Sequence, residues 1–136
     1  MKVKYKKPRI LFSEIIITDL DDGTLDIFEI LKNYSFTAKR MYILSSQKKI
    51  LHRGGHAHKK LNQIMICVKG SCNVTITNKK NISNTFLLNN LNQALFVPNH
   101  HWRTITLKPN SVLIVLASEK YIESDYERDF NNFLKN

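Results

Sequence analysis

Short runs of β-branched and aromatic residues recur about every ten residues through most of this sequence. Polar turn signals such as Arg53-Gly54-Gly55 separate the runs, and no helical pattern lies between them. This spacing favours an all-β antiparallel sandwich or barrel over a parallel sheet with crossover helices. The predicted strands are Ile10–Thr18, Leu25–Leu31, Arg40–Ser45, Asn62–Val68, Cys72–Thr77, Thr85–Leu88, Ala94–Val97, Trp102–Leu107 and Ser111–Ala117.

The end of the chain has a different pattern. Apolar side chains in Ser118–Leu134 recur near helical spacing, which predicts one or two short helices on the outside of the barrel. A chain of 136 residues has room for one core, so we expect a single domain over residues 1–136. No secretory signal and no apolar run of transmembrane length is present, which favours a cytoplasmic protein without membrane contact.

The charges lie in blocks. The formal net charge is +10, and residues 31–111 hold thirteen Lys or Arg but no Asp or Glu. Such an excess suggests a polyanionic partner, although scattered lysines on solvated faces explain much of it equally well. A barrel that binds single-stranded nucleic acid stacks bases on aromatic side chains, and residues 61–97 contain only Phe86 and Phe96. Nucleic-acid binding is therefore an alternative that the sequence disfavours.

The two cysteines have no spacing typical of a metal or disulfide framework. Cys67 and Cys72 stand five residues apart, which is neither a Cys-x-x-Cys pair nor part of a larger set. We expect both to be reduced residues of the core.

The most chemically informative motif is His56-Ala57-His58. Residues i and i+2 of a strand project from the same face, so the two imidazoles lie together. Such a pair can hold a metal or exchange protons near neutral pH. Two half-exposed histidines without a function are the alternative.

Two segments resemble the cupin signatures, and this resemblance implies a jelly-roll β-barrel. In the first, His56 and His58 are followed by Gln63 where metal-binding cupins have Glu. In the second, Arg103 stands where the fourth ligand, a histidine, is expected. A guanidinium cannot bind a divalent ion, so we expect no metal. A site with three histidines, completed by His100 or His101, is the alternative.

The wider sequence resembles the dTDP-4-keto-6-deoxy-D-glucose 3,4-ketoisomerases, which are metal-independent sugar-nucleotide cupins. The resemblance extends from about residue 20 to the end of the chain. One departure is Asp22, at a position where the family commonly has Arg. The matching segments are Arg53–Lys60 with Gln63, Lys39–Ile43, Val97-Pro98 with Trp102, and Val112–Ser118 with Tyr121, Asp125-Tyr126 and Arg128–Phe130.

This resemblance implies an enzyme and a reaction. A ketone would move from C4 to C3 of a dTDP-linked 6-deoxyhexose through an enediol, with the galacto product favoured over gluco. The product would enter the biosynthesis of a 3-amino-3,6-dideoxyhexose of a surface glycan. No cofactor is needed, and the resemblance implies a homodimer with exchanged N-terminal strands. Imidazole suits both proton roles, so His56 and His58 are the predicted catalytic residues.

The same resemblance implies a set of substrate-binding residues. Tyr42 and Gln63 are predicted hydrogen-bond partners, and Arg40 or Arg53 is predicted to bind the pyrophosphate, because a planar guanidinium matches phosphate oxygens. The remaining predicted contacts are His101 and Trp102, at the barrel mouth, and Arg103, at the position of the fourth cupin ligand. For Trp102 a place in the core is the alternative.

Two further alternatives keep the fold. A related cupin epimerase uses a His–Asp dyad, and residues 31–111 offer no Asp, which disfavours it. A sugar-sensing cupin without enzymatic activity is the other alternative, and no motif supports it directly.

Overall fold

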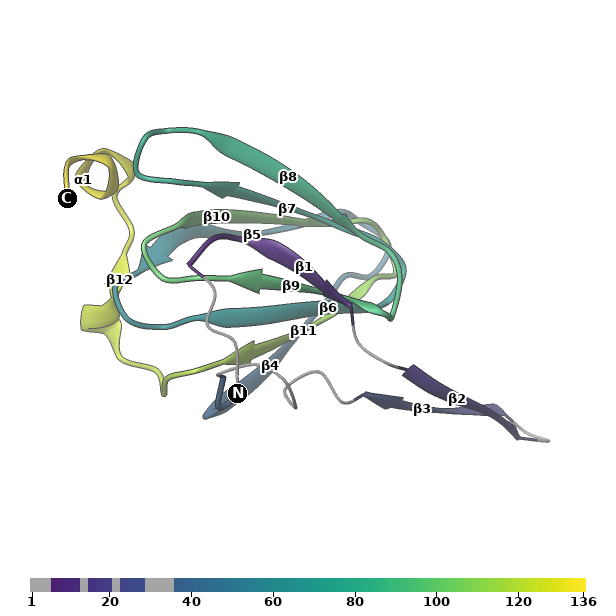
Figure 1. Cartoon of the computed structure of the whole chain (residues 1–136). Coiled ribbons are helices and arrows are strands. Elements are labelled where there is room, and N and C mark those ends of the chain that lie inside the picture. The colour runs from purple at the N-terminus through teal and green to yellow at the C-terminus, as the bar shows by residue number, and fades with distance from the viewer. Residues whose placement is uncertain (1–5, 13–14, 21–22, 29–35) are drawn as a thin grey trace.

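Two antiparallel sheets packed face to face form the body of the protein (Figure 1). The computed structural model describes residues 6–12, 15–20, 23–28 and 36–136. The first sheet contains, in spatial order, β1 (Arg9–Phe12), β9 (Gln93–Val97), β6 (Gln63–Lys69), β11 (Val112–Ala117) and β4 (Arg40–Ser45). The second contains β12 (Tyr126–Glu127), β5 (Leu51–His58), β10 (Trp102–Leu107), β7 (Cys72–Thr77) and β8 (Ser83–Leu88). The all-β prediction is therefore confirmed.

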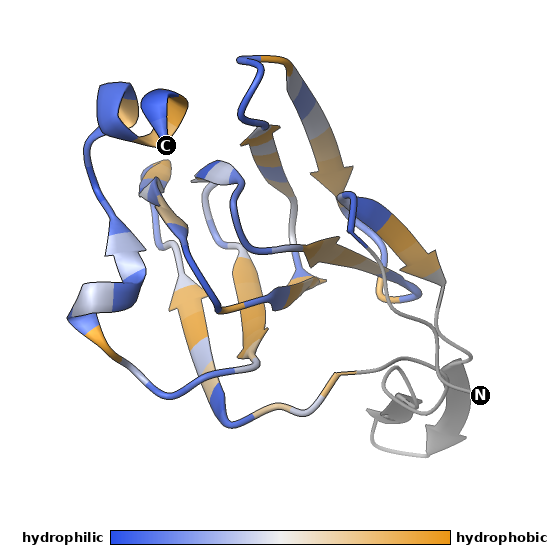
Figure 2. Cartoon of the chain, turned by 60° about the vertical axis from the view of Figure 1, so that its left-hand side comes forward, coloured by the Kyte–Doolittle hydropathy of each residue, from blue (hydrophilic) through white to orange (hydrophobic). Residues whose placement is uncertain are grey.

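The main core lies between the two sheets. Alternation along β7 places Cys72, Val74 and Ile76 in this core. Cys67 and Cys72 are both free and buried, as predicted. Figure 2 shows hydrophobic residues along the strands and hydrophilic residues in the turns.

Strand β6 is buried on both of its faces. Met65 and Cys67 point into the main core, whereas Ile64 and Ile66 point outward, into a second apolar cluster that includes Phe36 and Phe96. This explains why residues 63–68 read as an almost continuous apolar run rather than an alternating one. The first sheet is thus apolar on both sides.

One strand prediction and one turn prediction were wrong. The predicted strand Ile10–Thr18 is two strands, β1 and β2 (Ile15–Leu20), and residues 13–14 lie outside the described ranges. The predicted turn Arg53-Gly54-Gly55 lies inside β5. Both glycines have positive φ, and the register against β10 shifts between Arg103 and Thr104. A glycine pair marks bulges as well as turns, and the sequence pattern did not distinguish them.

The C-terminal segment crosses the end of the second sheet. It contains a 3₁₀ turn (Glu123–Asp125), the short strand β12 and the helix α1 (Phe130–Lys135), so the helical prediction is confirmed for the turn and for α1 but not for the rest of Ser118–Leu134. In β12, Tyr126 pairs with His58 of β5. The Asp129 side chain accepts a hydrogen bond from the Asn132 amide and caps α1. No helix in the described ranges is long and apolar enough to cross a membrane.

Gly70 and Gly55 provide a matched test of backbone packing. Both have φ of 74°, which strains an L side chain by about 1–3 kcal/mol. A Cβ at Gly70 would lie 2.9 Å from Ser111 Cα, whereas a Cβ at Gly55 would have nothing within 4 Å. We expect Gly70→Ala to lower the free energy of unfolding more than Gly55→Ala, as measured by urea denaturation. Equal losses would contradict the steric argument.

Candidate active site

Polar side chains from five strands meet between the sheets at one end of the barrel. They come from β4, β5, β6, β10 and β12, and they touch one another through hydrogen bonds and ring contacts. We call this group the histidine–arginine cluster. Its members are Arg40, Tyr42, His56, His58, Gln63, Arg103 and Tyr126.

Arg103 is the most deeply buried cation of the cluster, with a side chain that is not exposed at all. Its guanidinium donates hydrogen bonds to Gln63 Oε1 and to the His101 carbonyl oxygen. Gln63 Nε2 in turn donates to the Tyr42 hydroxyl oxygen at 3.1 Å. Burial lowers the pKa of Arg103 to about 10, so it carries its charge at neutral pH. Its Nε has no hydrogen-bond partner in the described part of the chain.

His56 and His58 lie beside one another, as their spacing predicts. Their ring centroids are 4.9 Å apart and the rings are nearly perpendicular. The Tyr126 ring contacts both imidazoles, with centroids at 4.9 Å from His56 and 4.3 Å from His58. Cross-strand pairing opposes His56 to Arg103, which directs both side chains toward the space between the sheets.

The cluster keeps both imidazoles neutral. Burial, and next the charge of Arg103, lower the pKa of His56 from 6.5 to about 4. Burial and then Arg103 also lower the pKa of His58, and to a greater extent. Burial raises the pKa of the Tyr42 phenol, which therefore stays protonated. A neutral imidazole has one nitrogen that can accept a proton, so each histidine can act as a base near pH 7.

An acidic residue reaches the cluster, contrary to the sequence argument that no Asp is available. Asp125 Oδ2 lies 3.1 Å from His58 Nδ1. Asp125 follows the acid-free residues 31–111, and the 3₁₀ turn carries it to the end of β5. Counting charges along the chain could not reveal this contact, because 67 positions separate the two residues.

The two arginines predicted for the pyrophosphate have different surroundings. Arg40 Nε and Nη2 are buried without a hydrogen-bond partner in the described part of the chain. The guanidinium carbon lies 5.7 Å from the ring centroids of Tyr42 and Tyr121. Arg53 is exposed, and its Nη1 donates to the His52 carbonyl oxygen at 3.1 Å. The structure therefore brings Arg40 into the cluster and leaves Arg53 at an exposed position.

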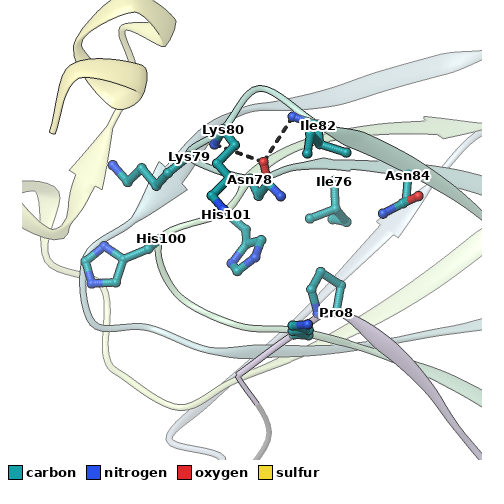
Figure 3. A pocket seen from close by; sticks show the side chains of 10 residues that line it. Pro8, Ile76, Asn78, Lys79, Lys80, Ile82, Asn84, His100 and His101 are labelled. Carbon is teal, nitrogen blue, oxygen red and sulfur yellow. Dashed lines mark hydrogen bonds between the residues drawn. The ribbon is translucent and has the colours of Figure 1, made fainter.

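His101 and Trp102 face different surroundings, since neighbouring residues of an extended chain point to opposite sides. The His101 ring lines a cavity of about 610 Å³ together with Ile76 and Pro8 (Figure 3). Trp102 packs against Phe130 and Phe133 of α1, at centroid distances of 5.1 and 5.8 Å. Its half-buried ring thus packs against the C-terminal helix outside the main core, and its contact with a substrate stays a prediction.

The side chains that could bind a metal can be compared with the prediction that the site holds none. Among the residues that the structure describes, no three His, Cys, Asp or Glu side chains are placed to hold one ion. His101 Nδ1 lies 2.8 Å from the Asn99 carbonyl oxygen, and His100 is exposed. The three-histidine alternative therefore finds no support in this geometry, and the metal-free site stays a prediction.

Asp125 and Tyr126 are the cluster contacts that the site prediction omitted. Both belong to the C-terminal segment Ser118–Leu134, whose apolar spacing predicts helices rather than a strand paired with β5. The signal that could have found them is the Asp-Tyr pair in the motif of the resembled family. Arg128, in the same motif, stacks on the Tyr126 ring at 4.3 Å and pairs with Glu123.

Comparisons with known proteins agree on one family. The family model "FdtA: WxcM-like, C-terminal" matches residues 9–136. A TDP-4-oxo-6-deoxy-alpha-D-glucose-3,4-oxoisomerase of Aneurinibacillus thermoaerophilus is 39% identical over 114 residues, which are 83% of this chain and 81% of that protein.

Solved structures give the same result. A sugar 3,4-ketoisomerase of Thermoanaerobacterium thermosaccharolyticum in complex with TDP matches with a TM-score of 0.82 and 29% identity, over 94% of this chain and 92% of that one. A 3,4-ketoisomerase of Helicobacter canadensis matches with a TM-score of 0.81 and 33% identity, over 96% and 97%.

Proposed function

The chain belongs to the FdtA family, and from this membership we propose that it is a TDP-sugar 3,4-ketoisomerase. Its substrate would be dTDP-4-keto-6-deoxy-D-glucose, whose ketone it moves from C4 to C3. The observation that carries the proposal is the pair of neutral imidazoles next to the buried guanidinium of Arg103. An isomerisation of this kind needs a base, an acid and a fixed positive charge. A neutral imidazole is the base, the imidazolium that it forms is the acid, and Arg103 provides the positive charge.

The proposed reaction consists of three proton movements. One imidazole removes the proton at C3, and the electron pair forms a C3–C4 double bond while negative charge develops on O4. A proton then moves from O3 to O4 with the help of the second imidazole. The first imidazolium returns a proton to C4, and the C3 oxygen becomes the ketone. The positive charge of Arg103 stabilises the intermediate anion, and it acts most strongly because the site is buried.

For the configuration at C4 we propose the galacto product. In the D-gluco substrate the C3 hydrogen lies on the lower face of the ring, and a galacto product receives its C4 hydrogen on that same face. A gluco product requires delivery from the opposite face. His56 and His58 project from one strand with their rings in contact, so a sugar bound against them would meet both imidazoles on the same side. One imidazole that removes and returns the proton on this side supports the galacto outcome.

Arg40 is the residue that we propose for the pyrophosphate. A charge-assisted hydrogen bond contributes about 1.5–3 kcal/mol, so Arg40→Ala is expected to raise KM roughly 10- to 100-fold. The change in kcat is expected to be smaller, because the pyrophosphate does not react. Steady-state kinetics measure both constants. Lys48→Ala removes one positive charge in the exposed turn after β4 and controls for net charge. Equal KM values in the two variants would contradict the role of Arg40.

We also propose a homodimer that exchanges its N-terminal strands. Within the described residues, β2 and β3 (Gly23–Phe28) pair only with each other, and they project from the barrel in Figure 1. A two-stranded hairpin alone is marginally stable in water. On the outer face of the first sheet, Met41 and Ile43 of the edge strand β4 are 59% and 53% exposed. A second copy would cover these surfaces, and light scattering that gives the mass of one chain would contradict the dimer.

The position in metabolism follows from the chemistry of the product. A ketone at C3 is the group that an amino transfer at C3 consumes. We therefore propose a cytoplasmic reaction that precedes formation of a 3-amino-3,6-dideoxyhexose for a surface glycan.

The test of the function is incubation with dTDP-4-keto-6-deoxy-D-glucose in D₂O, followed by NMR of the sugar. We expect a 3-keto product with deuterium at C4, and a small coupling between H4 and H5 in molecules that kept hydrogen at C4. A large coupling would reassign the product as gluco. Failure to form a 3-keto product would overturn the proposed activity.

The contact of His58 with Asp125 gives a second candidate a specific basis. A cupin epimerase that uses a His–Asp dyad would exchange the hydrogen at C3 or C5 and leave the ketone at C4. The same NMR experiment separates the two activities, because only the isomerase moves the ketone.

A further inference from the structure

The carboxylate of Asp125 is held rigidly at the end of β5. Its side chain is only 10% exposed. Oδ1 accepts a hydrogen bond from the Lys60 amide at 2.7 Å, and Oδ2 lies 3.3 Å from the Leu61 amide nitrogen, which donates to it. Because the backbone of the β5–β6 connection holds both oxygens, the position of Oδ2 next to His58 is determined independently of the imidazole.

This contact decides which nitrogen of His58 carries the proton. An ionised carboxylate only accepts hydrogen bonds, so Nδ1, at 3.1 Å from Oδ2, must be the N–H donor. In the neutral imidazole Nε2 is then the nitrogen with the free electron pair. His58 Nε2 is buried and has no hydrogen-bond partner in the described part of the chain. Its electron pair is therefore available to a molecule bound in the cluster.

We propose that Asp125 is the positioning residue of the reaction. It holds His58 in the Nδ1–H tautomer, so that Nε2 is the atom that accepts a substrate proton. When Nε2 takes that proton, the carboxylate stabilises the positive charge of the imidazolium, which burial and Arg103 disfavour. This inference rests on the proposed function for its meaning, but the tautomer itself can be measured without any substrate.

Asp125→Asn changes the electrostatics and keeps the shape. With Oδ1 still accepting from the Lys60 amide, the new Nδ2 group takes the place of Oδ2 and faces His58 Nδ1, and the longer hydrogen bond from the Leu61 amide is lost. It donates there, which forces the imidazole into the Nε2–H tautomer and removes the base. Since a wrong tautomer removes proton transfer and not binding, we expect kcat to fall roughly 10- to 100-fold with little change in KM.

The experiment combines kinetics with ¹⁵N NMR of the imidazole nitrogens. Long-range ¹H–¹⁵N correlation is expected to show Nδ1 of His58 protonated in the native protein and Nε2 protonated in Asp125→Asn. Asp129→Asn is the matched control, because it removes one negative charge from the same segment at the cap of α1. We expect it to preserve the tautomer and kcat.

The outcomes separate this inference from the function. A native His58 with Nε2 protonated overturns the inference even if the enzyme is active, and the native tautomer can be measured should Asp125→Asn fail to fold. A folded Asp125→Asn protein that keeps more than half of kcat also overturns it. If the native protein shows the Nδ1–H tautomer but no 3-keto product, the proposed function fails while the tautomer assignment holds.

Discussion

His56→Asn and His58→Asn are each expected to lower kcat by roughly 10²–10⁴, the usual contribution of a positioned general base. Asparagine keeps a polar side chain of similar reach, but its amide cannot accept a proton near neutral pH. The two imidazoles are buried, in contact and neutral, so each loss removes a proton-transfer group that no other described side chain of the cluster replaces. Stopped-time assays of the 3-keto product measure the effect.

His52→Asn is the control for this pair. His52 lies on the same strand, but it is exposed, with Nδ1 at 3.3 Å from Thr106 Oγ1. We expect His52→Asn to keep kcat and all three variants to bind TDP with similar affinity in calorimetry. If both His56→Asn and His58→Asn remain within about tenfold of the native rate, the catalytic roles belong to other residues.

Arg103→Met is expected to have the second largest effect on catalysis. Methionine fills much of the same volume, but the buried positive charge that we propose to stabilise the intermediate anion is lost. Removing one such donor costs roughly 10²–10³ in kcat. The charge of Arg103 also lowers the pKa of both histidines, so its loss has a second consequence that pH profiles can detect.

The sign of the pH effect follows from the base form of the histidines. In the native protein the pKa of His56 is about 4, so kcat/KM should stay level from pH 8 to about pH 5 and decline only near pH 4. Without Arg103 the pKa values rise toward the ordinary 6.5, and the decline moves to higher pH. Arg103→Lys retains the charge and loses the paired hydrogen bonds, so it should lower kcat and leave the decline near pH 4. An unchanged profile in Arg103→Met would contradict the electrostatic argument.

The strands with clean alternation were the ones that sequence reasoning located best. Arg40–Ser45, Cys72–Thr77 and Trp102–Leu107 agree residue by residue with β4, β7 and β10. Strand β5 was missed because Gly54 and Gly55 interrupt the pattern, although their positive φ serves a bulge. A Cβ at Gly54 would lie 2.6 Å from the Arg103 carbonyl oxygen, so the glycine permits the close approach of β10.

The features of the site that depend on neighbouring residues could also be predicted from the sequence. The spacing of His56 and His58 predicted two neighbouring imidazoles, because side-chain direction alternates along any strand. The replacement of a ligand histidine by Arg103 predicted a cation within a cupin site. That the guanidinium is buried and bonded to Gln63 required the pairing of β10 and the position of β6 opposite it.

Alternation of apolar and polar residues, turn signals and the His-Ala-His spacing are local properties, and by themselves they determined the all-β class and the histidine pair. The tertiary structure alone decided which distant groups surround that pair. It brought Asp125 into contact with His58 and packed Trp102 against α1. It also left buried N–H donors of Arg40 without a partner in the described part of the chain, whereas Arg53 is exposed. The reason is physical: strand periodicity specifies the face on which a side chain lies, whereas contacts across 67 positions depend on how β12 pairs with β5. Residues 31–111 indeed contain no Asp or Glu, but the inference that no carboxylate lies near the histidines was wrong, because Asp125 contacts His58.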